Sequence, residues 1–589
     1  MKLRSRFVAF LFFALIPQTK PRAISSSLVL THVAVIDATG ASAKPNMNVV
    51  IANGRIAAIG EPVRPPKDAQ IIDATGKFLI PGLWDMHVHW GDTGYLPLFL
   101  ANGVTGVRIM WGDPIHYEWR KRSAAGQLLA PHLVIASPLI DGPKPFWSGS
   151  ISVSTQTQAR EAVDQAKERG ADFVKVYSFL PREEYFAIAD EARKQNIAFA
   201  GHLPLAVSAK EASNAGQKSF EHLLGILPAC STRSTELTDA ARADLADDLV
   251  ASRPAFWGAH IKASRRIMLD TYSPEKAAAL FAILKKNGTW QCPTLTLLRT
   301  TTFADDPSSF TLDPRLKYIP PRMKGDWNPP GVAQDYGDPA FAAKEFQKDL
   351  EVVGAMQKAG VGILAGTDTS NPYCMPGFSL HDELGLLVKA GLTPMQALQA
   401  ATLNPARFLG TEKDYGTIEP GKIADLVLLD ANPLDDIANT KKIASVIYGG
   451  KLFPRAEIDR MLAQVEVLAA RPLIGNVLMK TIQEKGIAAT VAQYHDLKTN
   501  QPDAYDFSEQ EFIGLGYALL HMKKVPEAIA IFKLSVEAYP QSYNTWDSLA
   551  EAYMDHGDKE LAITNYKKSL AMDPKNTNAV DKLKQLNAP

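Results

Sequence analysis

The sequence predicts a multidomain protein: a (β/α)8 TIM-like barrel, a small β-sandwich built from both flanks of the barrel, and an all-α repeat solenoid at the C-terminus. Three observations predict this. Short apolar strands alternate with amphipathic helical stretches over residues 81–414, as in a parallel barrel. A β-rich pattern at 28–80 returns at 415–455, and from residue 460 a helical pattern repeats every 34 residues.

The composition limits the classes of function. With 589 residues, of which 46% are hydrophobic, the chain can form several domains with large cores. Lys plus Arg equals Asp plus Glu, at 63 each, so no overall charge recruits nucleic acid or an anionic membrane. We expect a small-molecule or peptide substrate. Only three cysteines are present, Cys230, Cys292 and Cys374, and their odd number and wide spacing give no disulfide framework.

The N-terminus has the pattern of an export signal. Lys2, Arg4 and Arg6 precede the apolar run 7–16, which is too short to span a membrane. We therefore expect residues 1–23 to be a signal peptide, no membrane span after its removal, and a periplasmic or secreted protein. A short buried helix or a retained anchor is the alternative.

The two flanks of the barrel are expected to form one domain. Residues 28–80 contain short β-rich runs, and Asn53-Gly54 marks a hairpin turn. A similar texture returns only at 415–455. The two segments are predicted to pair into a composite β-sandwich around the barrel.

The barrel strands are predicted from short apolar runs bounded by turn signals. The eight strands are Asp85–His89, Val104–Met110, His132–Ala136, Asp172–Tyr177, Ile197–His202, Ser219–His222, Gln291–Leu295 and Gly362–Asp368. Helices are predicted at Thr157–Arg169, Arg182–Gln195, Ala206–Ala215 and Pro339–Ala359. Residues 232–288 are expected to form a helical insertion. Residues 300–338 are expected to form a long loop, which is typical of lids and substrate-binding elements.

The C-terminal region, 460–589, has the period of tetratricopeptide (TPR) repeats. Phe512, Gly516, Ala528, Phe532 and Pro540 recur as Trp546, Ala550, Ala562, Tyr566 and Pro574, each 34 residues later. The small residues fall where the two helices of a repeat touch. A degenerate third repeat is predicted around Gly486–Tyr494, and Asn576–Leu586 as a polar capping helix. Such a module predicts a protein partner.

Two histidines, His87 and His89, are separated by a single residue. Residues i and i+2 of a strand face the same way, so both imidazoles can reach one metal ion. A polar face of an edge strand, or chance, would give the same pattern. The other strand ends decide between these readings, because barrel enzymes place catalytic residues there. The ends carry His87, His89, Lys175, His202, His222 and Asp368.

This set resembles the amidohydrolase superfamily, in particular imidazolonepropionase and the metal-dependent Xaa-Pro or Xaa-Arg dipeptidases. The resemblance covers roughly residues 28–455. The matching stretches are Ile80–His89, Val174–Tyr177, Ala200–His202, Phe220–His222, Ala365–Asp368, Ala401–Arg407 and Gly421–Val427.

The resemblance implies two divalent metal ions, zinc or alternatively manganese, iron or cobalt. Lys175 would be carbamylated and would bridge both ions. One ion would be held by His87, His89, Lys175 and Asp368, and the other by Lys175, His202 and His222, with a hydroxide between them. Asp368 would act as general base and then as acid toward the leaving amine. Alternatively, Lys175 pairs with an acidic neighbour and binds no metal. A mononuclear branch of the superfamily works without this lysine.

Four further residues are weaker candidates. Tyr177 shares the face of Lys175 and could donate to a substrate oxyanion, although a strand tyrosine also serves packing. Arg108 could clamp a substrate carboxylate, but an internal ion pair is the favoured interpretation. His381 could line the entrance, and Trp147 could form a pocket wall.

The sequence therefore predicts an exported, metal-dependent hydrolase of a C–N bond in a small substrate: a dipeptide, an N-acyl amino acid or a cyclic amide. Two alternatives remain. One is a mononuclear cyclic-amide hydrolase of the imidazolonepropionase type, and the other is a protein-binding scaffold whose TPR repeats act beside a vestigial barrel.

Overall fold

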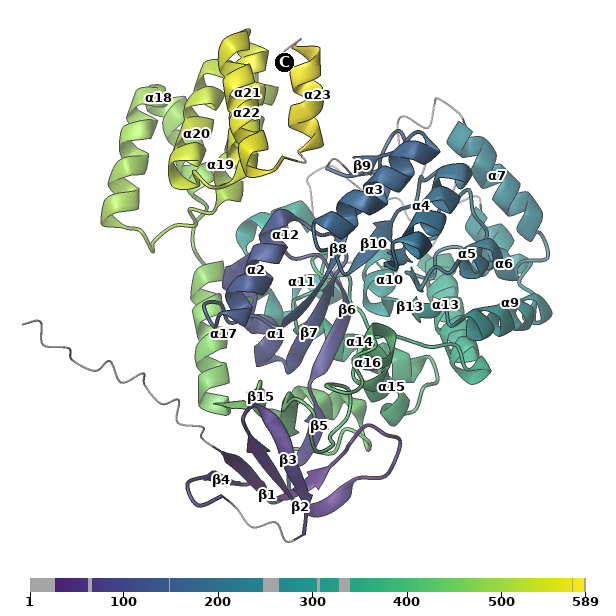
Figure 1. The fold of residues 1–589 in the computed structure, drawn as a ribbon. Helices are drawn as coiled ribbons and strands as arrows, with labels where there is room; N and C mark the ends of the chain where they lie inside the picture. The colour runs from purple at the N-terminus through teal and green to yellow at the C-terminus, as the bar shows by residue number, and fades with distance from the viewer. Residues whose placement is uncertain are drawn as a thin grey trace, which may run out of the picture.

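The computed structural model describes residues 27–61, 66–147, 149–246, 264–303, 308–327, 339–574 and 576–586. The predicted signal peptide, 1–23, lies outside the described residues. A central barrel lies between a β-rich unit formed near the N-terminus and a helical module formed by the last part of the chain (Figure 1). Within the described part of the chain, no helix is both long enough and apolar enough to cross a membrane.

Seven parallel strands form most of the barrel wall, in the order β13-β12-β11-β10-β8-β7-β6. They are β6 (Leu83–Val88), β7 (Val104–Ile109), β8 (His132–Asp141), β10 (Phe173–Val176), β11 (Ala198–Gly201), β12 (Ser219–Glu221) and β13 (Trp290–Cys292), and a short β9 (Ile151–Ser152) pairs with β8. All seven lie at predicted positions, so the barrel prediction is confirmed.

The eighth predicted strand, Gly362–Asp368, is not a regular strand. Its segment pairs only through two isolated bridges, Ile363 with Gln291 of β13 and Thr369 with Val88 of β6. These bridges link the two edge strands and nearly close the barrel. The backbone leaves the extended conformation at Asp368, whose φ is +57°, so a regular strand cannot continue through this residue.

The four predicted helices form, as α3 (Gln156–Glu168), α4 (Arg182–Lys194), α5 (Ala209–Ala215) and α13 (Pro339–Ala359). Helix α5 begins later than predicted because Ser208 caps it. The Ser208 hydroxyl accepts from the Glu211 N–H, and the Glu211 carboxylate accepts from the Ser208 N–H, which is a capping box. The remaining helices around the barrel are α1 (Pro97–Ala101), α2 (Pro114–Ala124), α6 (Ile226–Cys230), α7 (Ser234–Ala246), α9 (Pro274–Asn287), α10 (Leu295–Thr302), α14 (Phe378–Lys389), α15 (Pro394–Ala400) and α16 (Leu403–Leu409).

The expectation of a long loop at 300–338 was wrong for the residues described there. They form α11 (Ser308–Thr311), a 3-10 helix at Pro314–Tyr318 and α12 (Pro321–Trp327). Asp313 caps the 3-10 helix by accepting from the Arg315 N–H. Pro314 and Pro321 are the first residues of two of these helices. Proline is common there because the first residue of a helix needs no N–H for an intrahelical bond. Tyr336 lies outside the described residues.

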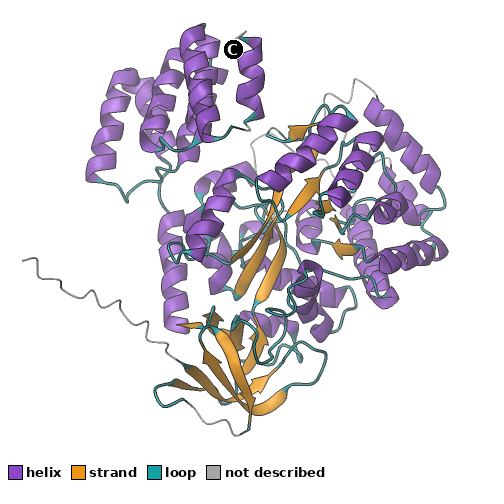
Figure 2. Ribbon diagram, in the orientation of Figure 1, coloured by secondary structure: helices purple, strands orange, loops and turns teal. Residues whose placement is uncertain are grey.

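Strands from both flanks join in one branched sheet, in the order β16-β15-β14-β5-β1-β2-β3, with β4 beside β1. They are β1 (Leu28–Val35), β2 (Lys44–Ala52), β3 (Arg55–Gly60), β4 (Gln70–Asp73), β5 (Phe78–Pro81), β14 (Leu426–Leu429), β15 (Ile443–Tyr448) and β16 (Lys451–Pro454). The antiparallel pair β5–β14 joins the flanks, and a small apolar core separate from that of the barrel packs among these strands. A two-layered sandwich stays a prediction. Figure 2 shows this unit as mainly strand and the C-terminal module as helices joined by loops.

The C-terminal helices are α17 (Arg455–Ala469), α18 (Ile474–Asn500), α19 (Glu509–His521), α20 (Val525–Ala538), α21 (Tyr543–His556), α22 (Lys559–Met572) and α23 (Thr577–Gln585). Helix α18 is bent at Gly486. The predicted small residues lie where helices touch: a Cβ on Gly516 would lie 2.4 Å from the Phe532 ring. Contacts that join these helices to the barrel include Tyr543 with Asp113, Arg169 with Asp573, and Lys317 with Glu466 of α17.

The close approach at Gly516 gives a stability prediction. In Gly516→Ala the new methyl group must displace the Phe532 ring, so local unfolding of α19 and α20 should become easier by about 1–3 kcal/mol. Hydrogen exchange of these helices measures this. The matched control is Gly514→Ala, where nothing lies within 4 Å of the new Cβ and protection should stay or rise by about 1 kcal/mol. Equal effects of the two substitutions would contradict the packing account.

Candidate metal centre

The candidate ligands all lie at the carboxyl end of the barrel. His87 is in β6 and His89 follows it, Lys175 is in β10, and His202 and His222 directly follow β11 and β12. Asp368 lies in the segment that links β13 to β6. The structure thus brings residues that are up to 281 positions apart in the sequence to one place.

Three ligand atoms form a tight triangle. His87 Nε2 lies 3.2 Å from His89 Nε2 and 3.2 Å from Asp368 Oδ1, and His89 Nε2 lies 3.1 Å from the same oxygen. Tetrahedral ligands about 2.0 Å from a zinc ion are about 3.3 Å from one another. The triangle therefore has the size of one face of a metal coordination shell.

A second group of imidazoles adjoins the triangle. The His222 ring centroid lies 4.6 Å from that of His87 and 4.9 Å from that of His202. His87, His222 and Asp368 also offer ligand atoms within 4.8 Å of one another. The four histidines and the aspartate therefore form one continuous cluster.

Three of the imidazoles are oriented by a second partner at Nδ1. The partners are Glu221 Oε2 at 2.9 Å for His87, Ser178 Oγ at 2.8 Å for His202, and Thr294 Oγ1 at 2.7 Å for His222. An imidazole held at Nδ1 has Nε2 left to bind a metal, and such outer partners are typical of metal-binding histidines. Burial lowers the pKa of His222 to about 4, which favours the neutral form that a ligand needs.

Lys175 lies in the same cluster and is fully buried. Its Nζ has no hydrogen-bond partner among the described residues, and the same holds for His89 Nδ1. Burial lowers the pKa of Lys175 to about 8, although Glu221 and Asp368 oppose this shift. Buried polar atoms without a partner are rare. Two of them beside a cluster of ligand atoms fit a site built for a further charged group.

Two candidate ligands have unusual backbone conformations. The φ of His222 is +59° and that of Asp368 is +57°, in the left-handed region that residues other than glycine seldom adopt. Such conformations cost about 1–3 kcal/mol each and cluster at functional sites. His222 directly follows β12 and Asp368 directly precedes the bridged Thr369, so both turns lie at the carboxyl end of the barrel.

Sequence reasoning missed Glu221, which positions the candidate ligand His87. Its carboxylate accepts from both Arg108 Nη2, at 2.9 and 3.0 Å, and Ser219 Oγ, besides holding His87. Arg108 is fully buried and also donates to the Met86 carbonyl. Arg108 is therefore an internal ion-pair partner, as favoured from the sequence. The signal for Glu221 was a lone acid in the short apolar strand Ser219–His222.

Glu221, His87 and Cys292 form a second group of possible metal ligands. Glu221 is already bonded to Arg108 and Ser219, and burial holds the pKa of Cys292 well above its ordinary value. Glu221 is therefore assigned to the support of His87 rather than to a second metal site. Cys230, Cys292 and Cys374 are all buried and unpaired.

Tyr177 and Trp147 lie together beside the cluster. The Tyr177 ring stacks on His202 with centroids 4.0 Å apart, and its hydroxyl accepts from Trp147 Nε1 at 2.9 Å. This leaves the hydroxyl hydrogen of Tyr177 free to donate elsewhere. His381 does not line the entrance: it is buried, with its ring nitrogens bonded to Thr440 Oγ1 and the Asn102 carbonyl, so it links α14 to its neighbours.

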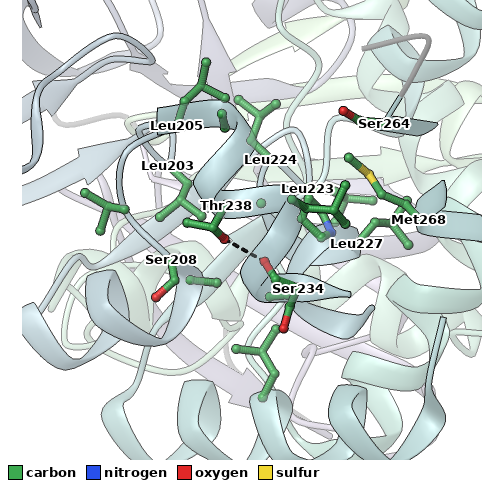
Figure 3. Close-up of a pocket in the computed structure, with 18 of the residues that line it drawn as sticks. Leu203, Leu205, Ser208, Leu223, Leu224, Leu227, Ser234, Thr238, Ser264 and Met268 are labelled. Carbon is green, nitrogen blue, oxygen red and sulfur yellow. Dashed lines mark hydrogen bonds between the residues drawn. The ribbon is translucent and has the colours of Figure 1, made fainter. Parts of the chain in front are cut away.

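A cavity of about 620 Å³ opens beside the cluster, and His222 and Ser178 are part of its wall. Figure 3 shows leucines around it, among them Leu203, Leu223 and Leu227. The site therefore has a metal-ligand cluster at one end and a mostly apolar space beside it.

The chain belongs to the amidohydrolase family, whose pattern residues 78–453 match. Residues 543–576 match the tetratricopeptide repeat, which confirms the predicted repeat module.

Known relatives agree with this assignment. Imidazolonepropionase from Shouchella clausii is 36% identical over 132 residues, which make up 20% of this chain and 29% of that protein. Among solved structures, a bottromycin amidohydrolase aligns with a TM-score of 0.59 and 24% identity, over 75% of this chain and 91% of that one. A Xaa-Pro dipeptidase aligns with a TM-score of 0.54 and 20% identity, over 73% and 100%. The two structural matches show a shared fold.

The burial of the Arg108–Glu221 pair predicts a large stability effect. Glu221→Gln leaves the guanidinium without a counter-charge, so the free energy of unfolding should fall by about 3–5 kcal/mol. The matched control is Glu236→Gln, which breaks the exposed pair with Arg233 and should cost no more than about 1 kcal/mol. Urea denaturation measures both. Similar losses for the two variants would show that the buried pair does not support the barrel.

Proposed function

We propose that this protein is an exported, metal-dependent amidohydrolase that cleaves a C–N bond of a small substrate, such as a dipeptide, an N-acyl amino acid or a cyclic amide. The observation that carries the proposal is the triangle of His87 Nε2, His89 Nε2 and Asp368 Oδ1, with sides of 3.1 and 3.2 Å. Membership of the amidohydrolase family supports it. Imidazolonepropionase, a relative, and the Xaa-Pro dipeptidase of the same fold give the substrate classes.

Two divalent ions would occupy the centre, zinc or alternatively manganese, iron or cobalt. His87, His89 and Asp368 would hold one ion, His202 and His222 the other, and a carbamylated Lys175 would hold both. The unpartnered, buried Lys175 Nζ supports this role, since an ammonium cannot ligate a cation but a carbamate can. When bound, the two ions would lower the pKa of a water molecule and polarise the scissile carbonyl.

Asp368 would act as general base and then as general acid. Its side chain is 7% exposed, and its buried Oδ1 lies close to both His87 Nε2 and His89 Nε2. A carboxylate there can accept a proton from water and pass it to the leaving amine. His222, His89 and Lys175 lower the pKa of Asp368 against the opposing effect of burial, which keeps the base ionised.

Tyr177 would donate to the oxyanion that forms from the carbonyl. Because Trp147 Nε1 donates to its oxygen, the hydroxyl hydrogen of Tyr177 points to another acceptor. Stacking on His202 fixes the ring beside the ligands. A fixed donor aimed at developing charge is a strong catalytic contribution.

The protein would also be exported and would bind a protein partner. The segment 1–23 would direct the chain to the periplasm or the outside of the cell. The helical module would bind a protein partner, as repeat arrays do. The mononuclear hydrolase and the scaffold with a vestigial barrel are the outcomes that the experiments below distinguish.

The proposed bridge predicts the metal content. Fully loaded wild-type protein should contain two ions per chain, and Lys175→Ala one at most, by mass spectrometry of the metals. The control is Lys218→Ala, a lysine that precedes β12 at the opposite end of the strand from His222, and it should keep both ions. One ion in an active wild-type protein would favour the mononuclear hydrolase. Two ions in Lys175→Ala would refute the bridge through Lys175.

The role of Tyr177 predicts a kinetic effect. Tyr177→Phe should lower kcat about 10²- to 10³-fold with a small change in KM, because the donor acts on the transition state. Tyr117→Phe is the control, since its hydroxyl donates to the Ala136 carbonyl, and its kcat should stay near that of wild type. A Tyr177→Phe enzyme with wild-type kcat would reduce this residue to packing.

A further inference from the structure

The cavity beside the candidate metal centre is close enough to the ligands to hold part of a substrate. His222, a candidate ligand, and Ser178, which holds His202, form part of its wall. His222 therefore belongs both to the cluster of candidate ligands and to the wall of the cavity. The volume, about 620 Å³, is that of a small-molecule pocket and far exceeds the size of one side chain.

Aliphatic side chains from four separate segments form a large part of the wall. They are Leu203 and Leu205 after β11, Leu223, Leu224 and Leu227 after β12, Leu237 and Ala241 of α7, and Leu280 and Ile283 of α9. Figure 3 shows Leu203 on one side of the space and Leu227 and Met268 on the other. Convergence of this kind makes a pocket for an apolar group, since burial of each methylene is favourable.

Several polar and charged residues of the wall have partners within the protein. Arg265 lies 2.9 Å from Glu345, and Arg242 lies 3.3 Å from Asp239. Thr238 donates to the Ser234 carbonyl, as the dashed line in Figure 3 shows. These paired groups offer little to a charged substituent. Lys210 and the buried Asp349 also line the cavity, so its surface is mixed, with a large apolar part that favours an apolar substituent.

We propose that this cavity binds a bulky apolar substituent attached to one side of the scissile amide, such as a medium-length acyl chain or a large aliphatic side chain of the leaving amino acid. This rests on the proposed function and names its substrate class. Small polar dipeptides and the cyclic amide would leave the cavity unfilled.

Two substrate series test the proposal with the full-length, zinc-loaded protein. In one series, N-acyl-L-alanines carry acyl chains from acetyl to decanoyl. In the other, N-acetyl amino acids carry straight side chains of one to eight carbons. In one of the two series kcat/KM should rise about four-fold for each added methylene until the cavity is full. The series that responds identifies the side of the amide that the cavity holds.

A variant and a control link the effect to the cavity. Leu227→Trp places a larger ring in the space and should lower the ratio of kcat/KM for the longest to the shortest member of the responding series by at least ten-fold. Leu129→Trp, at a partly exposed position that precedes β8, should keep the wild-type ratio. Melting temperatures report whether each variant is folded.

Binding separates this proposal from the proposed function. Calorimetric titration of the same compounds should show affinity that rises with chain length and falls in Leu227→Trp, whether or not the compounds are cleaved. Cleavage of short members without any gain from chain length, in kcat/KM or affinity, would overturn the cavity proposal alone. Length-dependent binding without cleavage of any member would overturn the proposed function and leave the cavity assignment standing.

Discussion

The buried ion pair between Arg108 and Glu221 is the interaction on which the candidate centre depends. Both side chains are fully buried, and a buried charge is tolerated only when it is paired and hydrogen-bonded. Arg108 meets this condition through Glu221, Ser219 and the Met86 carbonyl. These bonds join β6, β7 and β12 across the interior of the barrel.

The same carboxylate orients the first metal ligand. Glu221 Oε2 lies 2.9 Å from His87 Nδ1, which places the proton of the imidazole at Nδ1 and the lone pair at Nε2. His87 Nε2 then lies 3.2 Å from both His89 Nε2 and Asp368 Oδ1. Glu221 thus links the fold to the candidate metal ligands, because the carboxylate that neutralises Arg108 inside the barrel also orients His87.

Much of this arrangement could be predicted from the sequence because it follows local rules. Strand periodicity located seven barrel strands, and the carboxyl ends of parallel strands must converge, so His202 and His222 could be placed beside His87. The 34-residue period likewise predicted the helical module. Glu221, Ser178 and Thr294 could not be predicted as partners of the histidines, since each bond joins segments that local patterns do not relate. The predictions of a regular strand up to Asp368 and of His381 at the entrance failed for the same reason. Contacts between distant segments, isolated bridges in one case and hydrogen bonds in the other, determine both features.

The central claim is that two metal ions occupy this cluster. Anomalous diffraction at the zinc edge from crystals of the zinc-loaded protein tests it most directly. Our account expects two peaks about 3.5–4 Å apart, one beside His87, His89 and Asp368 and the other beside His202 and His222, with density for a carboxylate on Lys175 Nζ between them. A single peak with unmodified Lys175, or peaks away from these side chains, would contradict it.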